Sequence, residues 1–326
     1  MKQDKLRVGV IGVGHLGEYH VQKYKDLQNV EFMGVVDTNK IRAREISKKY
    51  NVKAYNEHSE LLTEVDAVSL AVPTEVHFEV ARKILDQRIH ILIEKPITYC
   101  IKDADNLLKQ AEEKGAILQV GLVERFNPAF LKMKTIFKDP ILLESHRMNT
   151  FTTRGLDVDV VLDLMIHDLD IILHMVPYEI KDLHAVGMSV ITKMTDVANV
   201  RIIFENGTVA NLTVSRVAHK TLRVLRIFQA NAYISVNYAK RELSIIEMGE
   251  KDINAMKTPQ ITTNKIEFFN RDPLADEIAS FVDVVMKGKT PLVSGADGRR
   301  ALAVALEIIE QIKKGCNNSQ GICSIK

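Results

Sequence analysis

The chain has 326 residues, of which 46% are hydrophobic and 26% charged, and these proportions are typical of a globular enzyme. The 44 Lys and Arg residues nearly balance the 42 Asp and Glu residues, so the net charge of +2 does not indicate a nucleic-acid-binding protein. The three cysteines form no C-x-x-C pair, and no uncharged apolar run reaches the roughly 18 residues of a membrane span. We therefore expect a cytoplasmic protein of about two domains, without a zinc site, disulfide framework or membrane span.

Strand and helix patterns alternate through the first third of the chain. The strand patterns are Leu6–Ile11, Glu31–Val36, Val52–Tyr55, Asp66–Val72, Ile89–Ile93 and Ala116–Val120. The helix patterns between them include Ile41–Tyr50, Val76–Gln87 and Ile101–Lys114. This alternation predicts a doubly wound parallel sheet with helices on both faces, which is the Rossmann arrangement, over residues 1–122.

The regular alternation of strand and helix patterns ends after residue 122. A helix pattern at 128–137, a strand at 141–148 and a long helix at 158–175 precede a run of strands. These strands are Asp182–Met188, Asp196–Phe204, Thr208–Val217, Leu222–Gln229, Ala232–Asn237 and Glu242–Glu247. Residues 251–270 read as irregular, and helices at 274–287 and 295–314 close the chain. Residues 123–326 are therefore predicted to form an α+β domain with a mostly antiparallel, open sheet.

A glycine-rich loop follows the first strand. Gly12, Gly14 and Gly17 fit G-x-G-x-x-G, with His15 and Leu16 inside the loop. The first glycine permits a tight turn, the second lets the backbone approach a pyrophosphate, and the third lets the helix pack on the strand. The pattern predicts dinucleotide binding at a helix N-terminus. His15 is either an exposed side chain or a phosphate contact.

A carboxylate ends the second strand. Asp37 lies 20 residues after Gly17, where a carboxylate accepts hydrogen bonds from the ribose 2′-OH and repels a 2′-phosphate. Asp37 therefore favours NAD as the cofactor. Lys40, Arg42 and Arg44 leave NADP open as the alternative, because cations there could hold a 2′-phosphate.

Ligands on such sheets bind beyond the carboxyl ends of the strands, where a first candidate segment follows the fourth strand. Pro73, Thr74 and His77 are cofactor-contact candidates there. Turn and capping chemistry explains Pro73 and Thr74 equally well, and His77 also fits a surface side chain.

A second segment, Glu94-Lys95-Pro96, follows the fifth strand. A charged pair that ends an apolar strand is either a Glu–Lys ion pair or part of the site. Its position beside the expected cofactor crevice favours a role in cofactor and substrate binding.

The long helix carries Asp163 and His167 at i,i+4 spacing, so they share one face, and Asp170 and His174 continue it. A plain solvated stripe is the alternative. The spacing is not that of a metal site, and we expect no metal.

Several segments spread over nearly the whole chain together form a specific pattern. They are Gly12–Gly17, Asp37, Val72–His77, Glu94–Pro96, Arg125–Pro128, Asp163–His167, Pro273–Glu277 and Gly295–Gly298. With them the chain resembles the Gfo/Idh/MocA family of sugar and inositol oxidoreductases. The resemblance implies an NAD-binding Rossmann domain and a second domain whose open sheet supplies the substrate platform and the contact of a homodimer or homotetramer.

Three segments place the chain within this family. They are Glu124–Pro128, Thr153–Asp168 and Ser215–Lys220. With them the chain resembles the branch that oxidises carbon 3 of UDP-N-acetylglucosamine, which is associated with lipid A containing a 2,3-diamino sugar. Many family members have paired glycines where this chain has Leu156-Asp157-Val158-Asp159.

Oxidation of an alcohol carbon needs a base for the hydroxyl proton and a cofactor for the hydride. Lys95 would need its pKa lowered from about 10.4 to about 7–8 to act as the base. The pKa of His167 starts at about 6.5, so it needs little change for the same role. We expect His167 to be the general base, Asp163 to orient it, and Lys95 to hold the reacting oxygen as a cation. Lys95 as the base remains the alternative.

A UDP-linked sugar carries two phosphates that need cations. Arg154, Arg216 and Lys220 are the candidates, with an intramolecular or interface ion pair as the alternative. Arg125 and Asn127 either shape the sugar pocket or begin a helix. The competing functions are a dehydrogenase of another sugar or inositol, and a non-catalytic NAD-binding regulator.

Overall fold

The computed structural model describes residues 5–152, 158–248 and 261–318. The chain folds as two compact units. Unit 1 comprises residues 1–123 and 272–302, and unit 2 comprises residues 124–271 and 303–326. Within the described ranges, no helix combines the length and the apolar character needed to cross a membrane.

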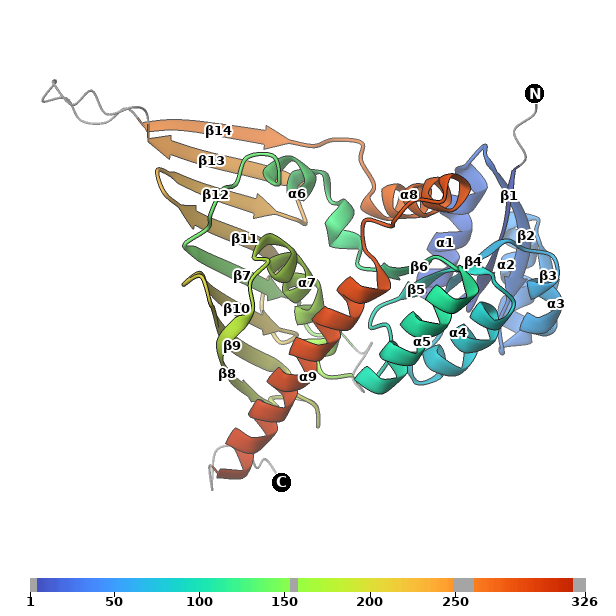
Figure 1. Cartoon of the computed structure of the whole chain (residues 1–326), viewed down its shortest axis with the longest axis horizontal. Coiled ribbons are helices and arrows are strands. Elements are labelled where there is room, and N and C mark those ends of the chain that lie inside the picture. The colour runs from blue at the N-terminus through green and yellow to red at the C-terminus, as the bar shows by residue number, and fades with distance from the viewer. Residues whose placement is uncertain (1–4, 153–157, 249–260, 319–326) are drawn as a thin grey trace, which may run out of the picture. The chain divides into compact units, whose positions relative to one another are not determined.

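Unit 1 is built on a six-stranded sheet with the order β3-β2-β1-β4-β5-β6 (Figure 1). Every neighbouring pair is parallel. The strands are β1 (Leu6–Ile11), β2 (Val30–Val36), β3 (Lys53–Tyr55), β4 (Ala67–Leu70), β5 (His90–Glu94) and β6 (Leu118–Gly121). The order reverses between β1 and β4, which is the switch point where such sheets bind ligands. The predicted doubly wound parallel sheet is confirmed.

Helices cover both faces of this sheet. They are α1 (His15–Asp26), α2 (Lys40–Tyr50), α3 (His58–Leu62), η1 (Thr74–Val76), α4 (His77–Asp86) and α5 (Ile101–Lys114). Val8 and Val10 of β1 join a buried cluster with α1, whereas the intervening Gly9 lies against Leu61 of α3. Successive side chains of a strand point to opposite faces, so α1 and α3 lie on opposite sides of the sheet.

Unit 1 also contains a helix from late in the chain, α8 (Pro273–Lys287). Its buried residues Ile278, Phe281 and Val282 belong to the same apolar cluster as Val8. The sequence assigned all of 123–326 to the second domain, and the structure differs by returning 272–302 to the first unit. The apolar face of α8 completes the core on the α1 side of the sheet, and chain position alone does not reveal that placement.

Unit 2 contains an eight-stranded sheet with the order β14-β13-β12-β11-β7-β10-β9-β8. Its strands are β7 (Leu142–Met148), β8 (Ile180–Met188), β9 (Val197–Phe204), β10 (Val209–Ser215), β11 (Leu222–Gln229), β12 (Ala232–Asn237), β13 (Glu242–Met248) and β14 (Ile261–Glu267). The β7–β10 pair is parallel and the other pairs are antiparallel. This confirms the predicted mostly antiparallel sheet.

The helical segments of unit 2 are η2 (Val123–Phe126, of which Val123 closes unit 1), α6 (Pro128–Met133), η3 (Val161–Met165) and α7 (Ile166–Met175). The last helix, α9 (Gly295–Asn318), begins in unit 1 and ends in unit 2. The predicted long helix at 158–175 is not a continuous α-helix, because η3 is a π-helical turn. Such turns interrupt α-helices frequently at functional sites.

One further local prediction differs from the structure. Part of the stretch predicted to be irregular, residues 261–267, forms strand β14, whose side chains are mostly exposed and so show no apolar alternation. Residues 251–260 of that stretch lie outside the described residues.

The first testable prediction concerns α8. Phe281 is fully buried, whereas Phe269 is 73% exposed, so the two residues form a matched pair. Phe281→Ala should lower the free energy of unfolding by about 3–5 kcal/mol, and Phe269→Ala should change it by less than about 0.5 kcal/mol. Urea denaturation followed by circular dichroism measures both. Equal effects would contradict the placement of α8 in the core of unit 1.

Candidate active site

The glycine loop of unit 1 meets the requirements that the sequence set. Gly12 has φ of +85°, and a Cβ there would lie 2.5 Å from the Ala71 carbonyl oxygen. A Cβ on Gly17 would lie 1.9 Å from the Gly12 carbonyl oxygen, so close packing excludes a side chain at both positions. A Cβ on Gly14 would meet nothing within 4 Å, and Gly14 is the N-cap of α1. This open backbone leaves room for a pyrophosphate. His15 and Leu16 are exposed beside it.

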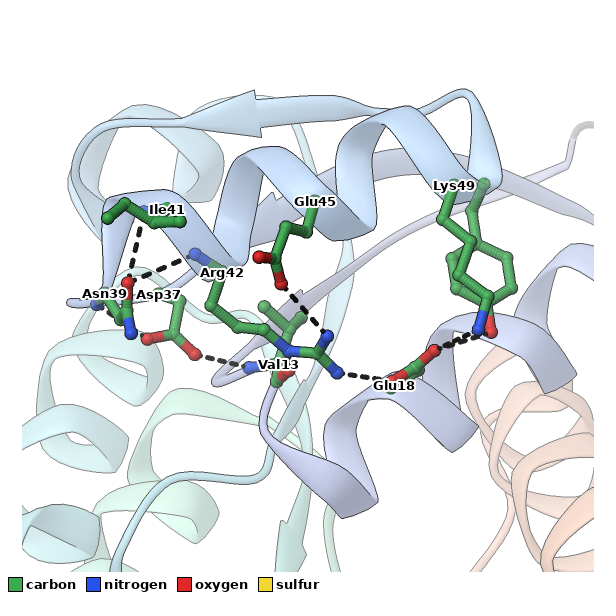
Figure 2. Close-up of polar contacts among 9 residues, drawn as sticks. Val13, Glu18, Asp37, Asn39, Ile41, Arg42, Glu45 and Lys49 are labelled. Carbon is green, nitrogen blue, oxygen red and sulfur yellow. Dashed lines mark hydrogen bonds and ion pairs between the residues drawn. The ribbon is translucent and has the colours of Figure 1, made fainter.

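Asp37 fastens the loop to the end of β2 (Figure 2). Its Oδ2 accepts a hydrogen bond from the Val13 amide at 2.8 Å, and its Oδ1 accepts one from the Asn39 amide at 2.8 Å. Each carboxylate oxygen has a second lone pair, so the same group can still accept from a ribose hydroxyl. Asp37 therefore both holds the loop and offers a negative charge to the ribose.

The basic residues considered for a 2′-phosphate make contacts within the chain. Arg42 Nε donates to the Val13 carbonyl oxygen at 2.9 Å, and its guanidinium pairs with Glu18 (Figure 2). Lys40 Nζ donates to the Asp37 and Asn56 carbonyl oxygens. Lys40 and Arg42, two of the three cations considered, are therefore engaged in contacts within the chain that do not require a 2′-phosphate. This agrees with NAD as the cofactor.

Glu18 gathers the cations of this region. The hydrogen bond from Lys49, opposed by burial and reinforced by Arg42 and Tyr50, lowers the pKa of Glu18 to about 2. Lys49 Nζ lies 2.6 Å from its Oε1, and the Tyr50 hydroxyl donates to the same oxygen at 3.1 Å. The contacts join α1 to α2 on either side of the cofactor loop.

The loop after β4 contains Pro73, Thr74 and His77. Pro73 is exposed and Thr74 half-buried, and the N-termini of η1 and α4 have no side-chain cap. The interpretation of His77 as a surface side chain is wrong, because only 1% of it is exposed. Its Nδ1 lies 2.9 Å from the Pro96 carbonyl oxygen and its Nε2 lies 3.0 Å from that of Val72. His77 thus links the loop after β4 to the loop after β5.

Lys95 is half-buried and directly follows β5, and its peptide bond to Pro96 is cis. The preceding Glu94 is buried. Its Oε1 lies 3.0 Å from His20 Nε2, and its Oε2 accepts a hydrogen bond from the Lys95 amide at 3.3 Å. Glu94 was predicted to contact the cofactor, whereas these contacts turn its carboxylate into the interior of unit 1.

His20 was missed by the sequence reasoning. It is fully buried on α1, and its Nδ1 lies 2.9 Å from Ser69 Oγ. The buried positions of α1 are Gly17, His20, Val21 and Tyr24, which have the i, i+3, i+4, i+7 spacing of a core-facing stripe. A polar residue in such a stripe was the available signal.

In unit 2, Asp163 and His167 lie on the same face, as predicted. Between residues 159 and 176, the side chains that are not buried are Asp163, His167 and His174. Asp170 departs from this face. It is 4% exposed, and its Oδ2 lies 3.8 Å from Arg125 Nε. The helix is therefore surrounded by protein except along one narrow stripe that holds the predicted base and its orienter.

A buried ionic network lies beside this stripe. Arg147 of β7 binds Asp168 through two hydrogen bonds of 2.7 and 3.1 Å and donates to Glu124 Oε1 at 3.0 Å. Asp168 directly follows His167 in the chain. The two-point contact of a planar guanidinium with a carboxylate has a defined geometry, so it fixes α7 against the sheet.

Arg125 and Asn127 support the backbone. Arg125 is 1% exposed and Asn127 is 2% exposed. Asn127 caps α6 by accepting from the Ala129 amide, and its Nδ2 donates to Glu124 and to the Tyr238 carbonyl oxygen. These contacts match the interpretation that the two residues begin a helix. They do not support a direct contact of either residue with the sugar.

Arg216, Lys220 and Arg154 were the cations proposed for a diphosphate. Arg216 is 7% exposed, donates to the Val158 carbonyl oxygen and has its Nε 3.8 Å from Asp196 Oδ1. The Asp196 contact is an intramolecular ion pair, which was the alternative to diphosphate binding by Arg216. Lys220 is exposed, and Arg154 lies outside the described residues.

The fold and the loop chemistry define a class. A doubly wound parallel sheet with this glycine loop, a carboxylate after β2 and a lysine after β5 is that of an NAD-dependent oxidoreductase. Residues 6–122 match the oxidoreductase family with an NAD-binding Rossmann fold, and residues 131–234 match the GFO/IDH/MocA C-terminal domain. The chain belongs to the Gfo/Idh/MocA family, and the predicted resemblance is confirmed.

Similar proteins cover nearly the full chain. UDP-N-acetylglucosamine 3-dehydrogenase of Acidithiobacillus ferrooxidans is 38% identical over 93% of this chain and 96% of its own length. A solved structure of that enzyme, named GnnA, matches with a TM-score of 0.89 at 37% identity, over 96% of this chain and 99% of that one. Myo-inositol 2-dehydrogenase of Thermotoga maritima is 26% identical over 91% of this chain and 93% of its own length.

The second prediction concerns the choice of cofactor. Asp37→Asn removes the charge that repels a 2′-phosphate, and it keeps an oxygen for the Val13 amide. The ratio of the NADP to the NAD dissociation constant should fall roughly tenfold, which corresponds to about 1.4 kcal/mol. Calorimetric titration with both cofactors measures the ratio. The control is Asp26→Asn at the far end of α1, and an unchanged ratio in Asp37→Asn would contradict the assignment.

The third prediction concerns Glu277 of α8, which is fully buried and has, among the residues that the structure describes, no hydrogen-bond partner for either carboxylate oxygen. Burial, and then the charge of Glu94, raises the pKa of Glu277 well above its ordinary value. As pH rises, the Glu277 carboxyl loses its proton in the unfolded chain before it does so in the folded protein. The free energy of unfolding is therefore unaffected by this group below about pH 4.5, and above that pH it falls by about 1.4 kcal/mol per pH unit. Glu277→Gln should therefore become more stable than the wild type as pH rises from 5 to 8.

Glu18 supplies a control of opposite sign. Its lowered pKa means that its contribution is present above about pH 4.5 and is lost as pH falls toward 2. The free energy of unfolding of the wild type should therefore rise relative to that of Glu18→Gln as pH rises from about 2 to about 4.5. Urea denaturation across these pH ranges measures both variants. Parallel curves for Glu277→Gln and the wild type would contradict a protonated Glu277.

Proposed function

We propose that this protein oxidises the C3 hydroxyl of UDP-N-acetylglucosamine with NAD, giving the 3-keto sugar and NADH. The observation that carries the proposal is the 38% identity to the Acidithiobacillus ferrooxidans enzyme of that name, over 93% of the chain. The positions of Lys95 at the end of β5 and of His167 on the accessible stripe of α7 support it.

The reaction moves two hydrogens. Bound NAD would supply the acceptor for the hydride that carbon 3 loses, and the hydroxyl proton leaves for a base as the carbonyl forms. We assign His167 as the base and Asp163 as its orienter. Lys95 holds the hydroxyl oxygen and stabilises the alkoxide that develops on it. Lys95 as the base is the alternative assignment, in which His167 would position the substrate.

The diphosphate of the substrate calls for a cation. Lys220 is an exposed cation at the end of the Ser215–Lys220 segment, and that exposure supports its contact with the diphosphate. Arg154 remains a second candidate from the sequence. Arg216, Arg125 and Asn127 instead make the buried contacts described above, so we give them no direct substrate contact.

The wider setting belongs to the same proposal. The keto sugar is a substrate for transamination, which would lead to a 2,3-diamino sugar for lipid A. We propose that the reaction takes place in the cytoplasm and that the enzyme is a homodimer or homotetramer.

Oxidation of another sugar or of inositol is the second candidate. The 26% identity to myo-inositol 2-dehydrogenase over 91% of the chain favours it. The chemistry would be the same, and the nucleotide would be dispensable. Activity that requires the UDP group distinguishes the two candidates.

The fourth prediction tests the reaction. Purified protein with NAD and UDP-N-acetylglucosamine should form NADH, measured by absorbance, when an amino donor and a partner transaminase remove the keto sugar. Lys95→Ala and His167→Ala should each lower kcat on the order of 10²–10⁴-fold. His174→Ala, on the same accessible stripe, is the matched control and should retain kcat. Added imidazole should partly restore His167→Ala if His167 is the base.

Other outcomes contradict the proposal in distinct ways. NADH formation from myo-inositol or a free sugar, with none from the UDP sugar, would favour the second candidate. Full biological effect of Lys95→Ala in cells would favour a non-catalytic NAD-binding regulator. Restoration of Lys95→Ala by a small amine, without rescue of His167→Ala by imidazole, would favour Lys95 as the base.

A further inference from the structure

Lys95 can hold a reacting oxygen only if its backbone is fixed. Its side chain has four rotatable carbons, and a misplacement of about 1 Å can cost on the order of 10²-fold in rate. The ladder of β5 ends at Glu94, which pairs with Gly121 of β6, so the sheet itself does not hold Lys95. The contacts of its two neighbours in the chain therefore help to fix where the Lys95 backbone lies.

The residue before Lys95 is held by His20. Glu94 Oε1 lies 3.0 Å from His20 Nε2. Because an ionised carboxylate only accepts, Nε2 donates to it, and Nδ1 lies 2.9 Å from the Ser69 hydroxyl oxygen. The Tyr24 hydroxyl lies 2.8 Å from Ser69 Oγ. Each of these groups can donate to the next, and the chain of hydrogen bonds ends on Glu94.

The charge of Glu94 is consistent with this arrangement. Burial alone would raise its pKa, but the hydrogen bond and charge of His20, together with the charge and the amide of Lys95, outweigh burial and lower the pKa below its ordinary value. Glu94 Oε2 accepts from the Lys95 amide at 3.3 Å. A Cβ on Gly121 would lie 3.0 Å from that oxygen, so any larger residue there would have to displace the carboxylate by a few tenths of an ångström. The Glu94 carboxylate therefore has one well-defined position.

The residue after Lys95 is held by His77. This ring lies between the Pro96 carbonyl oxygen, 2.9 Å from Nδ1, and the Val72 carbonyl oxygen, 3.0 Å from Nε2. It is 1% exposed and begins α4. Burial lowers the pKa of His77 and favours the neutral ring, which has one N–H and donates to one of these two oxygens. Donation from Nδ1 to Pro96 attaches the loop after β5 to the start of α4, next to the strand at which the sheet order reverses.

We propose that His20 and His77 are positioning residues for Lys95, since they fix the residue on each side of it from two different helices. The inference rests on the proposed function, in which Lys95 holds the reacting oxygen. Neither histidine touches the substrate in this proposal. His20 acts through the Glu94 carboxylate, and His77 acts through the Pro96 carbonyl.

The chain offers a matched control for a merely structural effect. His90 is the first residue of β5, at the opposite end of the strand from Glu94. It is partly buried, and its Nδ1 accepts a hydrogen bond from the Ile117 amide at 2.9 Å. Loss of this histidine disturbs the same sheet without touching the 94–96 segment.

The fifth prediction compares three leucine variants and two conservative ones. His20→Leu and His77→Leu should lower kcat on the order of 10²-fold, whereas the NAD dissociation constant changes less than about threefold. His20→Gln keeps a donor near Nε2, and His77→Asn keeps one near Nδ1, so both should recover part of kcat. His90→Leu should leave kcat within about twofold at a similar loss of thermal stability. A loss of kcat in all three leucine variants that follows stability would overturn the inference.

A second measurement needs no turnover. The lysines are labelled by reductive ¹³C-methylation, and Lys95→Arg identifies the Lys95 signal by its disappearance. The Lys95 signal should shift or broaden in His20→Leu and His77→Leu and stay unchanged in His90→Leu. If a leucine variant fails to fold, its conservative counterpart, His20→Gln or His77→Asn, is compared with the wild type instead. The Lys95 signal of that conservative variant should shift in the same way, by a smaller amount.

The two measurements separate the possible failures. Wild-type protein that binds NAD without oxidising the UDP sugar would refute the proposed function and leave the Lys95 signal as the test of positioning. An unchanged Lys95 signal in the folded His20 and His77 variants would overturn the positioning role, whatever the turnover.

Discussion

The structure of unit 1 depends on the buried carboxylate of Glu94. A charge removed from water is costly unless it is paired and hydrogen-bonded, and here His20 and the Lys95 amide meet that requirement. The pairing brings a polar side chain into the core-facing stripe of α1, and the carboxylate packs closely on Gly121. One interaction therefore constrains a helix, two strands and the residue that we assign to hold the substrate oxygen.

Unit 2 uses the same physical solution. His167 is accessible on one side of α7, and the adjacent Asp168 is buried on Arg147, which also binds Glu124. Removing one partner of such a buried group typically costs about 3–5 kcal/mol, because the other charges stay behind without compensation. In each unit, a candidate catalytic side chain thus follows or precedes a carboxylate in the chain that is locked into the interior. Reactive groups gain a defined position in this way without being buried themselves.

The cofactor loop shows how a single residue can serve binding and structure together. Asp37 holds the Val13 amide and keeps acceptor capacity for a ribose, and Arg42 adds a contact to the Val13 carbonyl oxygen. The loop is thereby organised before the cofactor arrives, and preorganisation of this kind lowers the entropy lost on binding. Membership of the Gfo/Idh/MocA family and the similarity to UDP-N-acetylglucosamine 3-dehydrogenase give this site its chemical context.

The sequence by itself determined the class of fold and the cofactor loop and predicted the candidate reactive side chains, because these depend on local signals. Apolar periodicity marks strands and helices, G-x-G-x-x-G follows from steric needs within a few residues, and i,i+4 spacing places Asp163 and His167 on one helix face. Only the tertiary structure decided the partners. It turned Glu94 and His77 inward, tied up Arg125 and Arg216, and returned α8 to unit 1. Such outcomes depend on contacts between residues far apart in the chain, and a burial pattern or a charge in one segment does not specify which distant group will satisfy it.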